Sequence, residues 1–156
     1  MASHALDLTL HDADQTARLA VTLGRALAAG DVVLLTGDVG AGKTHFARAL
    51  IQSLLTVPED VPSPTFTLVQ TYDAPAAAIW HADLYRLTSV YEIEELGLTD
   101  AFSDAIGLVE WPDRLGDLRP EDALDLTMTV TGDDTRRLSA TWNDDKWPEK
   151  LGAWRK

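Results

Sequence analysis

The strongest constraint on this chain is the segment GDVGAGKT at residues 37–44, which matches the pattern G-x-x-x-x-G-K-[ST] at every fixed position. The apolar and β-branched run at 32–36 precedes it and predicts a strand that is buried on both faces. Residues 45–51 follow it and predict a helix that runs to about Leu55. A strand, a glycine-rich loop and a helix form the context in which this pattern binds phosphate groups, so we expect the chain to bind a nucleotide.

The residue types within this segment suit a polyphosphate. Its glycines permit backbone conformations and close approaches that a Cβ atom would block, so backbone N–H groups can surround the anion. The amino end of the following helix adds partial positive charge. The Lys43 ammonium can contact the β- and γ-phosphates, and the Thr44 hydroxyl can bind Mg²⁺. The predicted nucleotide-binding residues of this loop are Gly37, Asp38, Val39, Gly40, Ala41, Gly42, Lys43 and Thr44.

The charge of the chain argues against tight, direct binding of DNA or RNA. Thirteen Lys and Arg residues stand against 25 Asp and Glu residues, which gives a net charge of −12. Affinity for nucleic acids comes largely from cations that neutralise phosphates, and the sequence contains no stripe rich in Lys and Arg. Two interpretations of the acidity remain: a solvated surface that favours solubility, or an acidic face for a basic protein partner.

Length and composition predict one soluble domain over residues 1–156, with an unassigned carboxy-terminal tail from about residue 143. No apolar run approaches about 20 residues, so we expect no membrane span. The first residues lack the basic and apolar regions of a signal peptide, so a cytoplasmic location is expected. The sequence contains no cysteine, which excludes disulfides and thiol catalysis.

The remaining segments predict one α/β arrangement with antiparallel additions. A half-buried strand over 6–10 is followed by a helix that Asp12 or Asp14 can cap and that Gly30 ends. A proline-rich loop occupies 57–64. The elements expected after this loop are a hairpin of strands 65–72 and 77–83, a short helix from Ser89 to about Gly97, a strand over 105–110, and a hairpin of strands 124–130 and 137–142.

Two carboxylates are candidates for chemistry because each follows a predicted strand. Glu110 ends the run 105–110, at the edge where open α/β sheets bind their ligands, and is the expected metal-side acid. Asp83 ends the run 77–83 and either orients a water molecule near the metal or caps the following turn. His81, two positions earlier on the same face, is expected to make structural hydrogen bonds.

Three further segments have more than one interpretation. The loop SPTF at 63–66 resembles a switch segment, but it is also typical of an ordinary proline-rich loop. Tyr85 and Arg86 form either a partner-facing pair or an ordinary surface pair. Trp111 directly follows a core strand and either stacks on a polar group or packs in the core, which is the commoner place for a tryptophan in that position.

Five segments together resemble the TsaE (YjeE) family. They are GDVGAGKT at 37–44, SPTFTLV at 63–69, HADLYRL at 81–87, EELG at 94–97 and LVEWP at 108–112. Their order and spacing match that family, the second and third segments are specific to it, and the resemblance extends from about Leu8 to about Ala140. This family is the small ATPase of bacterial tRNA N6-threonylcarbamoyladenosine (t6A) synthesis.

The resemblance implies an α/β, P-loop NTPase-like three-layer sandwich with a central parallel sheet and antiparallel edge strands. It implies ATP or ADP on the loop at 37–44 and Mg²⁺ at Thr44 and Glu110. Asp14 and Gly132 would border the adenosine.

The resemblance also implies catalytic roles and a partner. Lys43, Asp83, Glu110 and Thr65 would be the catalytic residues, with Asp83 as an acid/base or as a residue behind the metal. The partner would be the TsaB–TsaD heterodimer, whose TsaD subunit modifies adenosine 37 of tRNAs that read ANN codons. ATP hydrolysis would reset that complex between turnovers, so tRNA would be contacted only indirectly and neither DNA nor a membrane is expected.

Two other functions are compatible with the P-loop. A small-molecule P-loop kinase needs an arginine-bearing lid and a pocket for the acceptor, and no arginine cluster follows the P-loop helix. A nucleotide-gated binding module would hold ATP or ADP without significant hydrolysis. Lys43, Thr44, Asp83 and Glu110 together argue against such a module.

Overall fold

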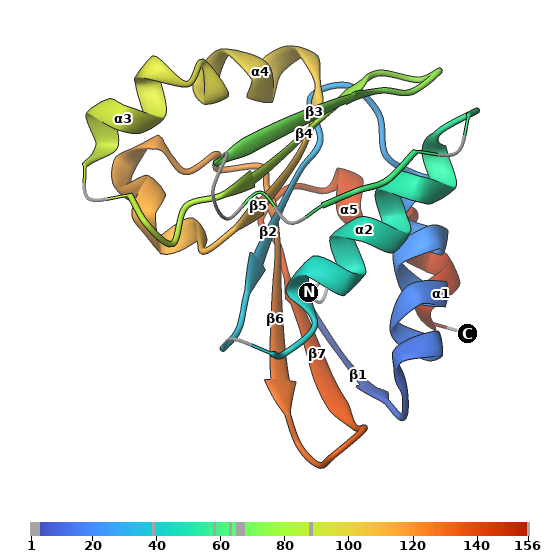
Figure 1. Cartoon of the computed structure of the whole chain (residues 1–156). Coiled ribbons are helices and arrows are strands. Elements are labelled where there is room, and N and C mark those ends of the chain that lie inside the picture. Colours follow the sequence, from blue (N-terminus) through green and yellow to red (C-terminus); the bar gives the residue numbers. More distant parts are fainter. Residues whose placement is uncertain are drawn as a thin grey trace.

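A seven-stranded mixed sheet organises the part of the chain that the computed structural model describes, namely residues 4–38, 40–57, 59–62, 64, 68–87 and 89–155 (Figure 1). The strands follow the order β1-β7-β6-β2-β5-β4-β3. Their bounds are β1 Ala5–Leu10, β2 Val32–Thr36, β3 Val69–Asp73, β4 Ala78–Asp83, β5 Ile106–Glu110, β6 Leu124–Val130 and β7 Arg136–Thr141. The central strands β6, β2, β5 and β4 pair in parallel, and β1, β7 and β3 add antiparallel pairs at the edges. The predicted α/β fold is therefore confirmed.

Helices cover both faces of this sheet, as Figure 1 shows. One face carries α1 (Ala13–Gly24) and α2 (Lys43–Leu54), and the other carries α3 (Val90–Glu95) and α4 (Leu98–Asp104). Val33 and Leu35 of β2 pack in the core on the α1 and α2 side, whereas Val32 and Leu34 pack in the core that contains residues of α3 and α4. Strand β2 is therefore buried on both faces, as predicted. Among the described residues, no helix is long and apolar enough to cross a membrane.

The first helix is shorter than the sequence predicts. Asp12 is its cap, because the Asp12 carboxylate accepts the N–H of Gln15 at 2.8 Å. The predicted end at Gly30 is wrong, since the helix ends at Gly24 and the N–H groups of residues 26 and 27 bond three residues back instead of four. Gly30 has a φ of 91° and instead belongs to the turn that leads into β2.

The structure confirms both predicted hairpins, formed by β3 with β4 and by β6 with β7. The first of these strands begins at Val69 rather than at residue 65, and residues 65–67 lie outside the described part of the chain. The predicted helix from Ser89 is α3, which that serine caps. Helix α4 was not predicted as a separate element. It begins after Gly97, whose φ of 76° breaks the helix and starts a new one.

The tail that the sequence left unassigned is part of the hydrophobic core. It forms α5 (Lys146–Lys150) and the 3₁₀ turn η2 (Gly152–Arg155). Trp147 and Trp154 are buried in the same core as α1 and α2. The Trp154 ring meets Phe46 of α2 edge-on at 6.4 Å between centroids, and its indole N–H donates to the Leu19 carbonyl at 3.1 Å. The tail therefore covers one side of the helical layer.

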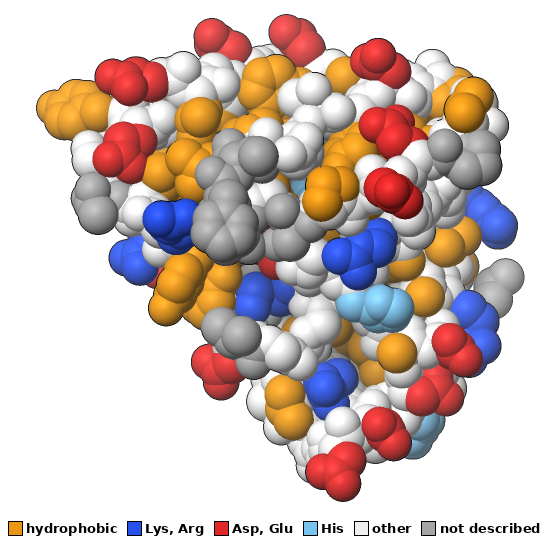
Figure 2. Space-filling view, viewed as in Figure 1, with side chains coloured by type: hydrophobic (Ala, Val, Ile, Leu, Met, Phe, Trp, Pro, Cys, Tyr) orange, Lys and Arg blue, Asp and Glu red, His pale blue; other side chains and the backbone are white. Residues whose placement is uncertain are grey.

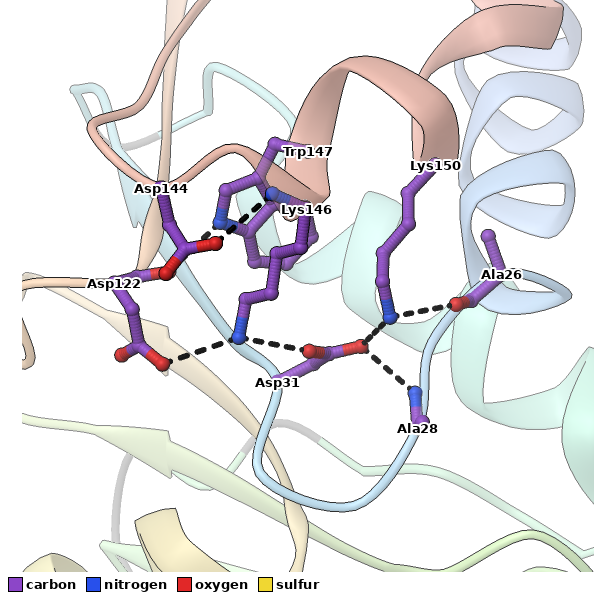
Figure 3. A network of polar contacts seen from close by, with 8 residues as sticks. All are labelled: Ala26, Ala28, Asp31, Asp122, Asp144, Lys146, Trp147 and Lys150. Carbon is purple, nitrogen blue, oxygen red and sulfur yellow. Dashed lines mark hydrogen bonds and ion pairs between the residues drawn. The ribbon is translucent and has the colours of Figure 1, made fainter.

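Asp31 ties this tail to the turn before β2 (Figure 3). Its carboxylate, in a residue only 3 % exposed, accepts from Lys146 Nζ at 3.0 Å, from Lys150 Nζ at 2.5 Å and from the Ala28 N–H at 2.8 Å. Burial raises the pKa of Asp31, but the hydrogen bonds from Lys150, Ala28 and Lys146 outweigh it and hold the pKa below its ordinary value. The buried charge is thus fully satisfied within the chain.

Replacing Asp31 with Ala is expected to lower the free energy of unfolding by about 1–3 kcal/mol at pH 7, because two lysines and a backbone N–H lose their common acceptor. The lowered pKa stabilises the fold above about pH 4, and this contribution is lost as the pH falls through the folded-state pKa. Urea unfolding of both proteins at pH 7 and at pH 3 measures the effect, and the difference should shrink at pH 3.

The matched control is Asp7→Ala, which removes an exposed ion pair with Arg137 on the β1–β7 strand pair. That change should lower the free energy of unfolding much less than Asp31→Ala does, because exposed ion pairs contribute little to stability. An equal loss for the two variants would contradict the anchoring role of Asp31.

Candidate nucleotide-binding site

Two glycines hold the loop at 37–44 close to strand β6. Gly37 has a φ of 155°, and a Cβ atom there would lie 2.6 Å from the carbonyl oxygen of Met128. Gly42 caps the amino end of α2 with a φ of 105°, and a Cβ there would lie 3.2 Å from the Met128 side chain. The strand behind the loop therefore requires glycine at position 37, and the left-handed backbone conformation favours glycine at position 42.

A cavity of about 400 Å³ lies beside this loop, at the carboxyl ends of β4 and β5. Its lining consists of Gly40, Gly42, Lys43, Thr44, His45, Asp83, Tyr85, Glu110 and Trp111. The structure thus brings four of the predicted chemical residues, Lys43, Thr44, Asp83 and Glu110, to one cavity. Figure 2 shows Lys and Arg side chains across the middle of this face, around the start of α2, with Asp and Glu toward its two ends.

The Lys43 ammonium is held by neutral groups. Its Nζ atom donates to the carbonyl oxygens of Gly37 at 2.5 Å and Asp38 at 3.0 Å, and it lies 4.3 Å from the centre of the Trp111 ring. Burial lowers the pKa of Lys43, and the charges of Glu110, Asp83 and Asp38 oppose this effect without cancelling it. A cation in this setting is well placed to bind an anion.

Thr44 and Glu110 bring two side-chain oxygen groups into direct contact at the cavity. The Thr44 hydroxyl donates to Glu110 Oε1 at 2.8 Å, which leaves the hydroxyl lone pairs available. Hard divalent cations prefer oxygen ligands, and small ones bind through one or two protein groups plus phosphates and water. In the described part of the chain, no cluster of three or more His, Cys, Asp or Glu side chains is placed to hold a metal alone. The pair therefore fits a cation that a nucleotide helps to bind.

Asp83 makes the turn-capping contact that was one of its two predicted roles, and it also lines the cavity. Its Oδ1 atom accepts the N–H of Tyr85 at 3.0 Å, so the carboxylate caps the turn after β4. The same residue lines the cavity and is the register partner of Glu110 across the parallel β4–β5 pair. Capping therefore holds this carboxylate next to the P-loop.

Several residues at the site were not predicted to act there. The core position favoured for Trp111 is wrong, since the residue is partly buried and lines the cavity with its ring 4.8 Å from that of Tyr85. Its contact with the Lys43 ammonium agrees with the other interpretation, stacking on a polar group. Its φ of 60° turns the chain sharply after β5, which periodicity does not reveal. His45 and Tyr85 also line the cavity. The sequence signals for Tyr85 were its place in the HADLYRL segment and its pairing with Arg86.

A second cavity of about 210 Å³ lies on the other side of the loop, beside the start of α1 and the β6–β7 turn. Its lining consists of Asp12, Ala13, Thr16, Ala41, Gly42, His45, Asp133, Asp134 and Arg136. Arg136 links that turn to the P-loop, because it donates to the carbonyls of Gly132 at 3.2 Å and Gly40 at 3.4 Å. Asp14 and Gly132 are sequence neighbours of this lining rather than members of it. Two other predicted residues, Val39 and Thr65, lie outside the described part of the chain.

Comparison with known proteins relates this arrangement to a family. A family model described as "Threonylcarbamoyl adenosine biosynthesis protein TsaE" matches residues 10–138. A Rickettsia bellii protein named "tRNA threonylcarbamoyladenosine biosynthesis protein TsaE" is 38% identical over 132 residues, which cover 85% of this chain and 92% of that protein. A Bacillus subtilis protein of the same name is 36% identical over 113 residues, or 72% of this chain and 70% of that protein. The crystal structure of Bacillus subtilis YdiB matches with a TM-score of 0.80 and 26% identity, covering 99% of this chain and 97% of that chain.

Replacing Gly37 with Ala is expected to lower the free energy of unfolding by about 1–3 kcal/mol, because the new Cβ meets the Met128 carbonyl at positive φ. Chemical unfolding measures the change. Gly152→Ala is the matched control, since a Cβ at Gly152 has no neighbour within 4 Å. A Gly37 variant as stable as the Gly152 variant would show that the loop can move away from β6.

Proposed function

The chain belongs to the TsaE family, a family of tRNA threonylcarbamoyladenosine biosynthesis with a P-loop NTPase-like fold, and from this premise we propose that it is a Mg²⁺-dependent ATPase of that pathway. The proposed nucleotides are ATP and its product ADP. The observation that carries the proposal is the convergence of Lys43, Thr44, Asp83 and Glu110 on one cavity beside the P-loop. P-loop ATPases need a phosphate-binding lysine, a hydroxyl and a carboxylate at the metal, and a group that orients water.

The P-loop binds the polyphosphate in this proposal. Its backbone N–H groups and the amino end of α2 stabilise the negative charge. Lys43 exchanges the carbonyls of Gly37 and Asp38 for phosphate oxygens, which are stronger acceptors because they are charged. Thr44 and Glu110 would hold Mg²⁺ from the protein side. The ion would supply positive charge that neutralises part of the phosphate charge.

Asp83 orients the attacking water and accepts its proton in this proposal. The bond from the Tyr85 N–H fixes the carboxylate at the cavity, so its position is set by the backbone. Thr65 keeps its proposed catalytic role in the switch-like loop. The adenosine occupies the second cavity, near Asp14 and Gly132, where Arg136 connects the β6–β7 turn to the P-loop.

The proposed partner is the TsaB–TsaD heterodimer. The family's pathway implies partner proteins, and a net charge of −12 suits contact with a protein complex better than unaided contact with tRNA. ATP hydrolysis would reset that complex between turnovers, with tRNA contacted only indirectly. A change of nucleotide at the P-loop can act on a partner only if the partner binds the two nucleotide states with different affinity.

Phosphate release from ATP should be slow for the isolated protein and should rise strongly when the TsaB–TsaD complex is added. Lys43→Ala should lower the stimulated rate by about 10²-fold or more, because the phosphates lose their main side-chain countercharge. Arg137→Ala removes an exposed cation that pairs with Asp7 and serves as the matched control. A coupled phosphate assay with and without the complex makes the measurement.

Three outcomes would replace this proposal. Hydrolysis that ignores the complex would favour a free-standing NTPase. Turnover that depends on a small acceptor molecule would favour a P-loop kinase. Tight ADP binding with no phosphate release under any partner condition would favour a nucleotide-gated binding module.

Glu110→Gln is expected to lower Mg²⁺-dependent turnover by about 10²-fold or more, because the amide carries no charge for the cation. ADP binding without Mg²⁺ should change little, since the P-loop contacts remain. Titration calorimetry with ADP in EDTA, beside the turnover assay, separates the two effects. An equal loss of both, with a lowered melting temperature, would indicate misfolding and contradict the metal-side role.

A further inference from the structure

His81 is a fully buried polar side chain that the proposed ATPase chemistry does not use. It lies on β4 among apolar residues and has no exposed surface. We propose that His81 is a positioning residue that holds the Glu110 carboxylate in the orientation needed at the metal–nucleotide site. This inference rests on the proposed function and assigns one more residue to the same site.

The parallel pairing of β4 and β5 explains how these two side chains meet. His81 is the register partner of Leu108, two residues before Glu110, so both side chains lie on the face that carries α2. Its Nε2 atom is 2.7 Å from Glu110 Oε2. Nε2 must be the donor in this contact, because a carboxylate oxygen only accepts. The histidine is therefore a fixed hydrogen-bond donor toward Glu110.

The two oxygens of Glu110 are bound by different donors. His81 donates to Oε2 at 2.7 Å, and the Thr44 hydroxyl donates to Oε1 at 2.8 Å. Two donors on opposite oxygens prevent rotation of the carboxylate about its terminal bond. The oxygen next to Thr44 then always faces the side where the metal is proposed to bind.

The other ring nitrogen supports a role directed at Glu110. Within the described part of the chain, His81 Nδ1 is buried and has no hydrogen-bond partner. A histidine that served only to connect strands would be expected to use both nitrogens, since buried polar atoms are rarely left unpaired. Among the described residues, the ring makes its hydrogen bond to Glu110 through Nε2, and Nδ1 stays buried without a partner despite the free energy that this costs.

Keeping Glu110 in place also keeps it away from the neighbouring cation. Lys43 is close enough for the Glu110 charge to affect its pKa, yet its ammonium donates to the carbonyls of Gly37 and Asp38. A Glu110 carboxylate that could rotate freely would be able to pair with the Lys43 ammonium. That pairing would neutralise the charge intended for the phosphates and remove the acid from the metal. By holding Glu110, His81 leaves the Lys43 ammonium available for the phosphates and the Glu110 carboxylate available for the metal.

The test compares His81→Gln with His81→Met. The two side chains have nearly the same length and shape, but only the Gln amide can donate from the position of Nε2. Calorimetric titration with ADP at a series of Mg²⁺ concentrations gives the Mg²⁺ concentration at which the effect of Mg²⁺ on ADP binding is half-maximal. Residues that orient a metal ligand usually change metal affinity by about 10–100-fold when removed. We expect a shift of this size for the Met variant and less than about threefold for Gln.

Two controls separate positioning from stability. Ile79→Met changes a buried residue two positions earlier on the same face of β4, and its Mg²⁺ requirement should match the wild type. ADP binding in EDTA should be the same for all the proteins, because the P-loop itself is unchanged.

The outcomes distinguish this inference from the function on which it rests. A Met variant with the wild-type Mg²⁺ requirement would overturn the role of His81 and leave the ATPase proposal intact. Equal impairment of the Gln and Met variants would also overturn it, because the donor would then be irrelevant. If the wild-type protein showed no Mg²⁺-dependent ADP binding, the proposed function would fail, and the inference with it.

Discussion

The parallel pairing of β5 with both β2 and β4 determines where the charged groups of the site lie. Parallel strands end at the same edge of a sheet, so Glu110 pairs with Asp83 on one side and with Leu35, two residues before Gly37 of the P-loop, on the other. A shift of one residue in either pairing would turn a terminal carboxylate to the opposite face of the sheet. The buried hydrophobic residues of these short strands prevent such a shift, because they pack against helices on both faces. The apolar core and the polar site are thus specified by the same register.

The buried charges before and after β2 have opposite kinds of partner: one is paired with opposite charges and the other with neutral groups. Asp31, just before the strand, is paired with Lys146 and Lys150 from the tail and needs nothing from outside the chain. Lys43, after the strand and its loop, is bonded to two neutral carbonyls, and burial lowers its pKa. A desolvated cation with neutral acceptors gains free energy when an anion binds, whereas a satisfied carboxylate does not change. The first arrangement is suited to stability and the second to a ligand.

The parts of the fold that follow from local pattern were predictable. The P-loop, the buried run at 32–36 and the carboxylate that ends 105–110 each depend on residues within a few positions of one another. The tail was not predictable in this way, because the partner of Lys150 is Asp31, 119 positions away, and no periodic pattern encodes that contact. The end of α1 was missed because the sequence offers two glycines, Gly24 and Gly30, and does not show that the backbone changes to bonds three residues back after the first of them. For His81, spacing gave the correct face of the strand but not its contact with Glu110, which requires the strand order.

Trp111 illustrates how backbone strain contributes to the arrangement of charges. Its φ of 60° and ψ of 55° are rare for a bulky residue and persist only where the surroundings hold them. Here the Trp111 N–H donates to the Leu35 carbonyl at 3.2 Å, which continues the β2–β5 pairing by one bond past the end of the strand. The turn brings the indole ring over the Lys43 ammonium, where an aromatic face attracts a cation without supplying a countercharge. Lys43 is therefore enclosed by groups that stabilise it only weakly, and a polyphosphate would replace them at little cost.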